Sequence, residues 1–464
     1  QPGPFAAPAT GPAYVKVGGP SRPFFFEGTG NVVGSAYYVS FLAPDLTTVR
    51  FARYSANYIP QNAPVLAAVD DINHTVGFWR PQPDYRIPER LSPGFADFPD
   101  AELEAMYEDQ GATFIPYQAR IGRRAIRENP DADLVMIYIE EPDGSGHQFT
   151  LTDPRQASNP LDPSSLGANQ DPGKVARFER YLQRAYQLAD RAVASVIDTV
   201  GVDGRGLPRS NIFVVSDHGM APFHTAVNLK TLLTDVGIDT ASDVLSVRTS
   251  GPAANIYVNL AGRESGGTVD AATYQTLVAQ IAGVLRNAKD PNWAFNYTLP
   301  AGRLFSQVSV RPLFCSEGVG FCTSDEIGQD SGDVFAVMAE GYNFDGIQRP
   351  RRRPPGDPPY DSATSVFSVP NFYGAHGYDP TLPSTSASFI AAGPAIRRYV
   401  TVDQVSNIDV APTIMHLLGV QPSRTVDGQV LPEILEVSQP RPVPPDQRTA
   451  GRNGAGMQAG DPPP

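Results

Sequence analysis

Three short segments of the sequence hold residue types that could bind a metal ion together. Glu140–His147 reads Glu-Glu-Pro-Asp-Gly-Ser-Gly-His, Ser216–Met220 reads Ser-Asp-His-Gly-Met, and Gly374–Asp379 reads Gly-Ala-His-Gly-Tyr-Asp. Each segment contains an aspartate and a histidine, and carboxylate oxygens and imidazole nitrogens are ligands of zinc and similar ions. One Asp and His pair is common by chance, but three such segments in a chain with only 6 histidines indicate a shared metal centre.

Two of these segments directly follow apolar runs of strand length. Leu134–Ile139 precedes the first segment, and Asn211–Val215 precedes the second. Continuous apolar runs are typical of strands that are buried on both faces of a sheet. Because ligands of open α/β sheets bind at the carboxyl ends of the strands, we expect the two segments to converge on one site.

The rest of the chain alternates strand and helix patterns, which predicts an α/β fold with a mostly parallel central sheet sandwiched between helices. Further strands are predicted at residues 254–260, 334–338 and 387–392. Helices are predicted at residues 175–200, 273–288 and 408–418, where apolar residues recur every three or four positions. We interpret residues 1–438 as one large domain and the Pro- and Gly-rich residues 439–464 as a disordered tail.

Composition excludes several classes of function. The chain has 464 residues and a formal net charge of −13, which disfavours binding to a nucleic-acid polymer or to an anionic membrane surface. The sequence contains no apolar run long enough for a membrane span. Hydrophobic residues make up 41% of the chain, which is enough for a sizeable core.

The chain has 2 cysteines, Cys315 and Cys322, separated by a short Gly-containing stretch. They could form a loop-closing disulfide or remain two free thiols, and we favour the disulfide because no further zinc ligands lie nearby. A disulfide indicates an oxidising compartment, so we expect a periplasmic or secreted protein.

The three segments also carry a resemblance to a known family. YIEEPDGSGH (138–147), VVSDHGM (214–220) and GAHGYD (374–379) resemble, in the same order, signature segments of the nucleotide pyrophosphatase/phosphodiesterase family of the alkaline phosphatase superfamily. Residues 389–420 resemble the closing strand and helix of that superfamily. The resemblance covers about residues 115–435.

This resemblance implies an alkaline-phosphatase-like fold with two zinc ions, although other divalent metals are possible. By match to the family motifs, Asp143, His147 and His376 would bind one zinc, and Asp217 and His218 the other. Such a pair of ions suits in-line phosphoryl transfer, here through a covalent phospho-enzyme. The implied substrate is a small molecule with a phosphodiester or pyrophosphate bond, such as a nucleotide-like compound.

One part of the family pattern is not found. The family has an earlier strand followed by Asp, and then a nucleophilic Thr or Ser in a Thr-x-Pro-Asn-like context, but the sequence before Leu134 contains neither. We expect the nucleophile segment upstream of Gln1, in the same polypeptide or as a separate chain, and we expect this chain alone to hydrolyse poorly. Two alternatives stay open: a sister phosphomonoesterase or phosphonate hydrolase, and a non-catalytic metal-binding protein that reuses the fold.

Two minor candidates complete the set of polar residues. Asp70, Asp71 and His74 could form a separate metal cluster, but an acidic run of this kind is more often a solvated loop. His224 could line the pocket, but a structural histidine is the favoured interpretation.

Overall fold

The structure is a computed structural model of the 464-residue chain. It describes residues 19–20, 24–27, 32–59, 67–68, 71–72, 74–77, 100–160, 162–240, 243–290, 302–344, 347–350, 366–370, 372–422 and 425–436. The predicted tail, 439–464, and Asp70 lie outside these residues. Contacts divide the chain into two compact units, one of residues 1–200 and 215–388 and one of residues 201–214 and 389–464.

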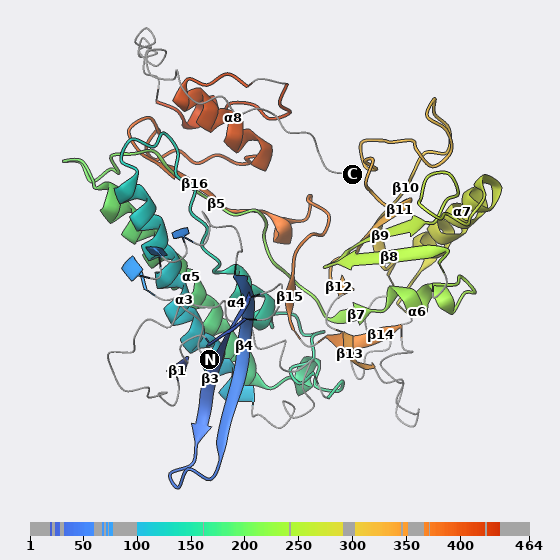
Figure 1. Ribbon diagram of the computed structural model, residues 1–464, viewed down its shortest axis with the longest axis horizontal. Helices are drawn as coiled ribbons and strands as arrows, with labels where there is room; N and C mark the ends of the chain where they lie inside the picture. Colours follow the sequence, from blue (N-terminus) through green and yellow to red (C-terminus); the bar gives the residue numbers. More distant parts are fainter. Residues whose placement is uncertain are drawn as a thin grey trace. The chain divides into compact units, whose positions relative to one another are not determined.

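Helices of the first unit are α3 (Asp100–Glu128), α4 (Asp143–Phe149), α5 (Pro172–Val200), α6 (Leu229–Thr234) and α7 (Ala271–Asn287). The two long helices α3 and α5 lie side by side, and α4 packs on α5 (Figure 1). The predicted helices at 175–200 and 273–288 are confirmed as α5 and α7. The Asp270 side chain accepts hydrogen bonds from the Ala272 and Thr273 N–H groups, which caps α7.

The strands of the first unit form small sheets. One sheet contains β1 (Gly19–Pro20), β3 (Val32–Leu42), β2 (Phe24–Glu27) and β4 (Val49–Ile59), and a second has the order β10 (Phe305–Val310), β11 (Val334–Met338), β9 (Ala253–Val258), β8 (Leu245–Ser250). A third has the order β12 (Tyr342–Asn343), β7 (Thr225–Val227), β14 (Phe367–Pro370), β13 (Ile347–Pro350), and β15 (Gly374–Ala375) pairs with β6 (Ala221–Pro222).

The sheets confirm the α/β class but not a mostly parallel central sheet. All pairs of the first two sheets are antiparallel, whereas β12 and β7 form a parallel pair in the third. Strands β8 and β9 are joined by a tight turn at Gly251, and such short connections give antiparallel neighbours. The predicted strands at 254–260 and 334–338 exist as β9 and β11, but they belong to this antiparallel sheet.

The predicted strand at Leu134–Ile139 is wrong. The segment is not part of any sheet of the described residues, and Met136 and Tyr138 are 87% and 67% exposed. Ile139 packs beside α3 and α5, and the Ile137 side chain approaches Gly122 of α3. The segment therefore places one face on the helices and leaves the other open, because no described strand pairs with it.

The largest core lies between α7 and the sheet of β8 to β11. Ile256, Val258, Tyr274, Ile281 and Leu285 are fully buried there, and α7 lies against β10 and β11 (Figure 1). A smaller aromatic cluster joins α3, α4 and α5 through Tyr107, Phe149 and Phe178. This second cluster supports α4, which carries part of the site.

The second unit contains β5 (Ile212–Val215, whose last residue falls in the first unit) paired with β16 (Phe389–Ala392), and α8 (Asn407–Leu418). These elements confirm the predicted strands at 211–215 and 387–392 and the predicted helix at 408–418. Helix α8 ends at Gly419, which adopts a left-handed conformation with φ 68°.

Two further expectations have an outcome in the structure. Cys315 and Cys322 form a disulfide with an S–S distance of 2.02 Å, which confirms the favoured pairing. None of the described helices has the length and apolar character that a membrane span requires.

Candidate metal centre

Helix α4 presents Asp143 and His147 on one face. Residues 143–149 form a helix, and residues four apart are neighbours on a helix surface. The Glu141 carboxylate accepts hydrogen bonds from the Ser145 backbone N–H and hydroxyl, at 3.1 and 2.8 Å. These bonds give the Ser145 N–H, in the first turn of α4, a hydrogen-bond acceptor, and this turn begins with Asp143, the first residue of the site.

Asp217 and His218 follow the end of β5, as the sequence predicts. The backbone at Gly219 lies against residues 384–386, and a Cβ atom there would collide with the backbone carbonyl oxygens of Ser384 and Ser386. The same Gly219 provides the carbonyl oxygen that accepts a hydrogen bond from His218 Nδ1, at 2.9 Å. A residue with a side chain at position 219 would therefore displace the backbone carbonyl that orients His218.

His376 follows the short strand β15, which packs beside α4. A Cβ atom at Gly374 would collide with the Gly146 carbonyl oxygen, so the close approach of β15 to α4 requires glycine there. The Gly374 carbonyl oxygen accepts a hydrogen bond from His147 Nδ1 at 2.8 Å. This strand thus supplies one histidine and orients another.

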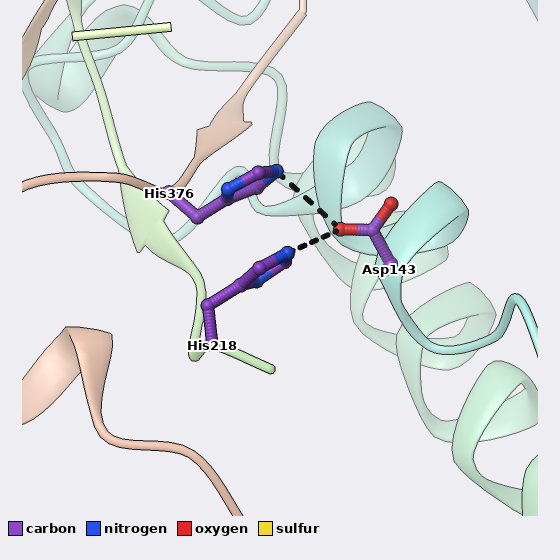
Figure 2. Close-up of side chains that lie close together, drawn as sticks. All are labelled: Asp143, His218 and His376. Atoms are coloured by element: carbon purple, nitrogen blue, oxygen red, sulfur yellow. Dashed lines mark ion pairs between the residues drawn. The ribbon is translucent and has the colours of Figure 1, made fainter. Parts of the chain in front are cut away.

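The three segments converge on one oxygen atom, Asp143 Oδ1. The Nε2 atoms of His147, His218 and His376 lie 3.5, 3.8 and 3.8 Å from it. Figure 2 shows the His218 and His376 rings extending side by side toward Asp143. These two rings stack with centroids 3.5 Å apart and an interplanar angle of 7°. Within the described part of the chain, Asp143, His218 and His376 form a group whose ligand atoms all lie within 4.8 Å of one another.

The geometry fits a zinc-sized ion. Zinc bonds of about 2.1 Å in a tetrahedral site put neighbouring ligand atoms about 3.4 Å apart, close to the distances seen here. Asp143 Oδ1 is buried and has no hydrogen-bond partner. A buried carboxylate oxygen without a partner is unfavourable unless a ligand completes it. His147 and His218 donate from Nδ1 to backbone carbonyls, an arrangement that directs Nε2 of each ring toward Asp143 Oδ1.

Electrostatics around the site favour a neutral ring at His376. Burial, reinforced by the neighbouring His218 and His147, lowers the pKa of His376 to about 4, so this ring is neutral at pH 7. Burial also raises the pKa of Glu141 to about 7, against the hydrogen bonds from Ser145. A neutral histidine can coordinate a metal, whereas a protonated one cannot.

The structure brings four of the five predicted metal-binding residues around Asp143 Oδ1, and the fifth, Asp217, close to one of them. Its Oδ1 lies 3.5 Å from His218 Nε2, and its side chain is 79% exposed. The proposed division into two zinc sites is not tested by these distances and stays a prediction. The sequence did not predict that the Gly219 and Gly374 carbonyls orient His218 and His147. The available signal was the small residues beside His218 and His376.

Among the minor candidates that the structure describes, His224 and Asp71 do not join this centre. His224 is buried, with Nδ1 at 2.8 Å from Thr225 Oγ1, which agrees with the structural interpretation. Asp71 is exposed and forms an ion pair with Arg124, which agrees with the interpretation as a solvated surface group.

A convergent cluster of one aspartate and three histidines suits a divalent metal ion of the kind that metal-dependent hydrolases use. Comparison with protein families gives a match to the type I phosphodiesterase / nucleotide pyrophosphatase family over residues 33–379. The chain therefore belongs to this family of hydrolases. The match begins earlier than the resemblance at about residue 115 and ends before the closing segment at 389–420. Comparison with curated proteins finds no match.

Proposed function

We propose that this protein hydrolyses phosphodiester or pyrophosphate bonds of small, nucleotide-like substrates, with two zinc ions in the site. The observation that carries the proposal is the buried, unpartnered Asp143 Oδ1 with three imidazole nitrogens at 3.5 to 3.8 Å. Following the family motifs, one ion is assigned to Asp143, His147 and His376, and the other to Asp217 and His218. A small-molecule phosphodiester substrate fits the family.

Zinc bound in such a site polarises a phosphoryl oxygen and activates a nucleophile. The protein's own contribution is to hold the histidine side chains in the orientation and protonation state that metal binding requires. The Gly374 and Gly219 carbonyls fix the ring orientation of His147 and His218, and burial keeps His376 neutral at pH 7. Little reorganisation is then needed when the site fills, which favours catalysis by a preorganised environment.

The proposal includes a covalent phospho-enzyme, formed when a Thr or Ser hydroxyl attacks phosphorus and the alcohol leaving group departs. No Thr/Ser-x-Pro-Asn segment occurs before Leu134, so we propose that the hydroxyl comes from a further segment, continuous with this chain or on a separate polypeptide. Acid-quenched labelling of the native protein with a radioactive phosphodiester would reveal the intermediate. Absence of label during turnover would remove this part of the proposal.

We also propose a periplasmic or secreted location, which the disulfide between Cys315 and Cys322 supports. Thiol labelling of the native protein, before and after reduction, tests it. Two thiols that react in freshly isolated, unreduced protein would contradict the location.

The central test compares a diester with a monoester. The native protein is assayed with bis(p-nitrophenyl) phosphate and p-nitrophenyl phosphate, before and after removal of metal by a chelator. We expect diester cleavage that chelation abolishes and zinc restores, and its loss in D143A. The control H416A removes an exposed histidine outside the site and is expected to behave as wild type. Cleavage of the monoester alone would replace the diesterase by the sister activity.

A further inference from the structure

One nitrogen atom in the site lies between two carboxylates. His218 Nε2 is 3.8 Å from Asp143 Oδ1 and 3.5 Å from Asp217 Oδ1. Both values are close to the separation of about 3.4 Å between neighbouring ligands of a tetrahedral zinc ion. The ring could therefore share an ion with either aspartate, but its single Nε2 lone pair can bind only one ion at a time.

The two carboxylates differ in their exposure to solvent, and therefore in how well they are positioned to bind a metal ion. Asp143 Oδ1 is buried and unpartnered, whereas the Asp217 side chain is 79% exposed. His376 already stacks on His218 and directs its own Nε2 to Asp143, as Figure 2 shows. Asp143, His218 and His376 thus form a group whose ligand atoms all lie within 4.8 Å of one another, and among the described residues neither Asp217 nor His147 belongs to that group. Three protein ligands and one open position are sufficient for a catalytic zinc ion.

We propose that the two ions enter in a fixed order and that His218 changes partner between them. The first ion binds to Asp143, His218 and His376. The second ion binds with Asp217 and takes His218 from the first, and His147 replaces it there. His147 is placed for this exchange because its Nε2 lies 3.5 Å from Asp143 Oδ1 and its Nδ1 is held by the Gly374 carbonyl. This inference rests on the proposed two-ion site and adds to it an order of filling.

The exchange predicts unequal affinities. The first ion meets an assembled set of ligands, but the second must break one bond of the first before it gains its own. The second ion therefore binds more weakly, and the intermediate with one ion is populated during a titration. The family motifs alone lead to a different expectation, in which His218 serves only the ion at Asp217.

The test is a zinc titration of the native protein against a chromophoric chelator, with native mass spectrometry to count bound ions. We expect H218A to weaken the first binding step by about a hundredfold or more, because loss of a direct ligand costs at least as much as loss of an orienting partner. D217N leaves the first step unchanged and removes the second. H147A leaves the first step within about threefold and weakens the second, because the first ion then has no replacement ligand.

Two controls make the titration interpretable. H416A removes a histidine outside the site and is expected to bind both ions as wild type does. H218Q keeps a polar side chain of similar length and replaces H218A if circular dichroism shows that H218A is unfolded.

Several outcomes decide the proposal. A first step that is intact in H218A, or that D217N weakens as strongly as H218A does, overturns it. So does wild-type protein that takes up both ions in one cooperative step. If the binding steps appear as expected but the loaded protein cleaves no diester, the proposed function fails and the order of filling stands. A wild-type protein that binds no zinc overturns both.

Discussion

Two clusters of ionisable side chains in the first unit differ in whether their central carboxylate has hydrogen-bond donors. Around Asp333, the carboxylate receives hydrogen bonds from Arg263 at 2.6 and 2.8 Å, from Arg311 at 3.0 Å and from the Tyr274 hydroxyl at 2.9 Å. Around Asp143, the carboxylate oxygen Oδ1 has no hydrogen-bond partner and faces three imidazoles.

The Asp333 cluster is complete without a ligand. Burial alone would raise the pKa of Asp333, but hydrogen bonds from Arg263 and the Val258 N–H outweigh it and lower the pKa, so the group stays ionised. Arg311 and Arg263 also donate to the carbonyls of Cys322 and Gly320, which ties the disulfide loop to the core. At the Asp143 cluster no hydrogen-bond donor reaches Oδ1, so a bound cation would complete it.

The first prediction concerns loss of Asp143, the central carboxylate of the metal centre. D143A removes the oxygen on which the three histidines converge, so the site loses its common ligand. Diester hydrolysis by the zinc-loaded protein is expected to fall by about a thousandfold, equivalent to several kcal/mol of transition-state stabilisation. Steady-state kinetics measure it, with D325N as a control at an exposed carboxylate. Wild-type turnover in D143A would show that this oxygen has no part in the reaction.

The second prediction concerns loss of Asp333, the carboxylate that Arg263, Arg311 and Tyr274 surround. D333A leaves the buried guanidinium of Arg311, which is 2% exposed, without its carboxylate. Loss of one member of a buried ion pair typically lowers the unfolding free energy by about 3 to 5 kcal/mol. Urea unfolding measures it, and D333N serves if D333A does not fold.

The same variant separates the two clusters, because the hydrogen-bond and ion-pair partners found for Asp333 among the described residues lie outside the metal centre. Folded D333N should bind zinc with wild-type affinity. A parallel loss of zinc affinity would mean that the clusters are coupled.

The third prediction compares how much zinc stabilises the folded protein when each cluster is altered. Zinc at about a hundred times its dissociation constant should raise the unfolding free energy of wild type by about 2.7 kcal/mol, because it binds the folded centre. D333N should retain this increment, whereas D143A should lose it. Thermal unfolding with and without zinc measures both, and magnesium at the same concentration controls for general ion effects. An equal increment in D143A would place the ion elsewhere.

The sequence predicted which polar residues lie together better than it predicted the sheets. Residue type and order singled out Asp143, His147, Asp217, His218 and His376 as candidate ligands, and the structure brings them close to one another, while their binding of metal stays a prediction. The apolar run Leu134–Ile139 misled because a run shows that a segment can be buried, not that a partner strand is present.

Helix α3 was missed for a different reason. Its buried face includes Glu104 and Gln110, at 2% and 1% exposure, so the apolar spacing that marks a helix is interrupted. Pro116 and Gly111 within the helix weaken the signal further. The Glu104 carboxylate is compensated by Arg177 at 3.0 Å, a contact between distant residues that no local pattern shows.

The last prediction concerns Glu108 of α3, a carboxylate that pairs with one arginine, whereas Asp333 pairs with two. Its side chain is 11% exposed and forms an ion pair with Arg184 at 3.3 Å, but Oε2 has no hydrogen bond. Burial raises its pKa from 4.5 to about 7, against the opposing charge of Arg184 and with the help of Glu141. The folded protein therefore holds this proton more tightly than the unfolded chain does.

The stability that Glu108 contributes is fully present below pH 4.5 and is lost as the pH rises through about 7. Between pH 5 and 8 this loss is on the order of 2 kcal/mol. E108Q, which does not titrate, should remove this part of the pH dependence in urea unfolding, whereas E128Q, at an exposed carboxylate of the same helix, should keep it. An unchanged pH slope in E108Q would mean that Arg184 compensates Glu108 as fully as the two arginines compensate Asp333.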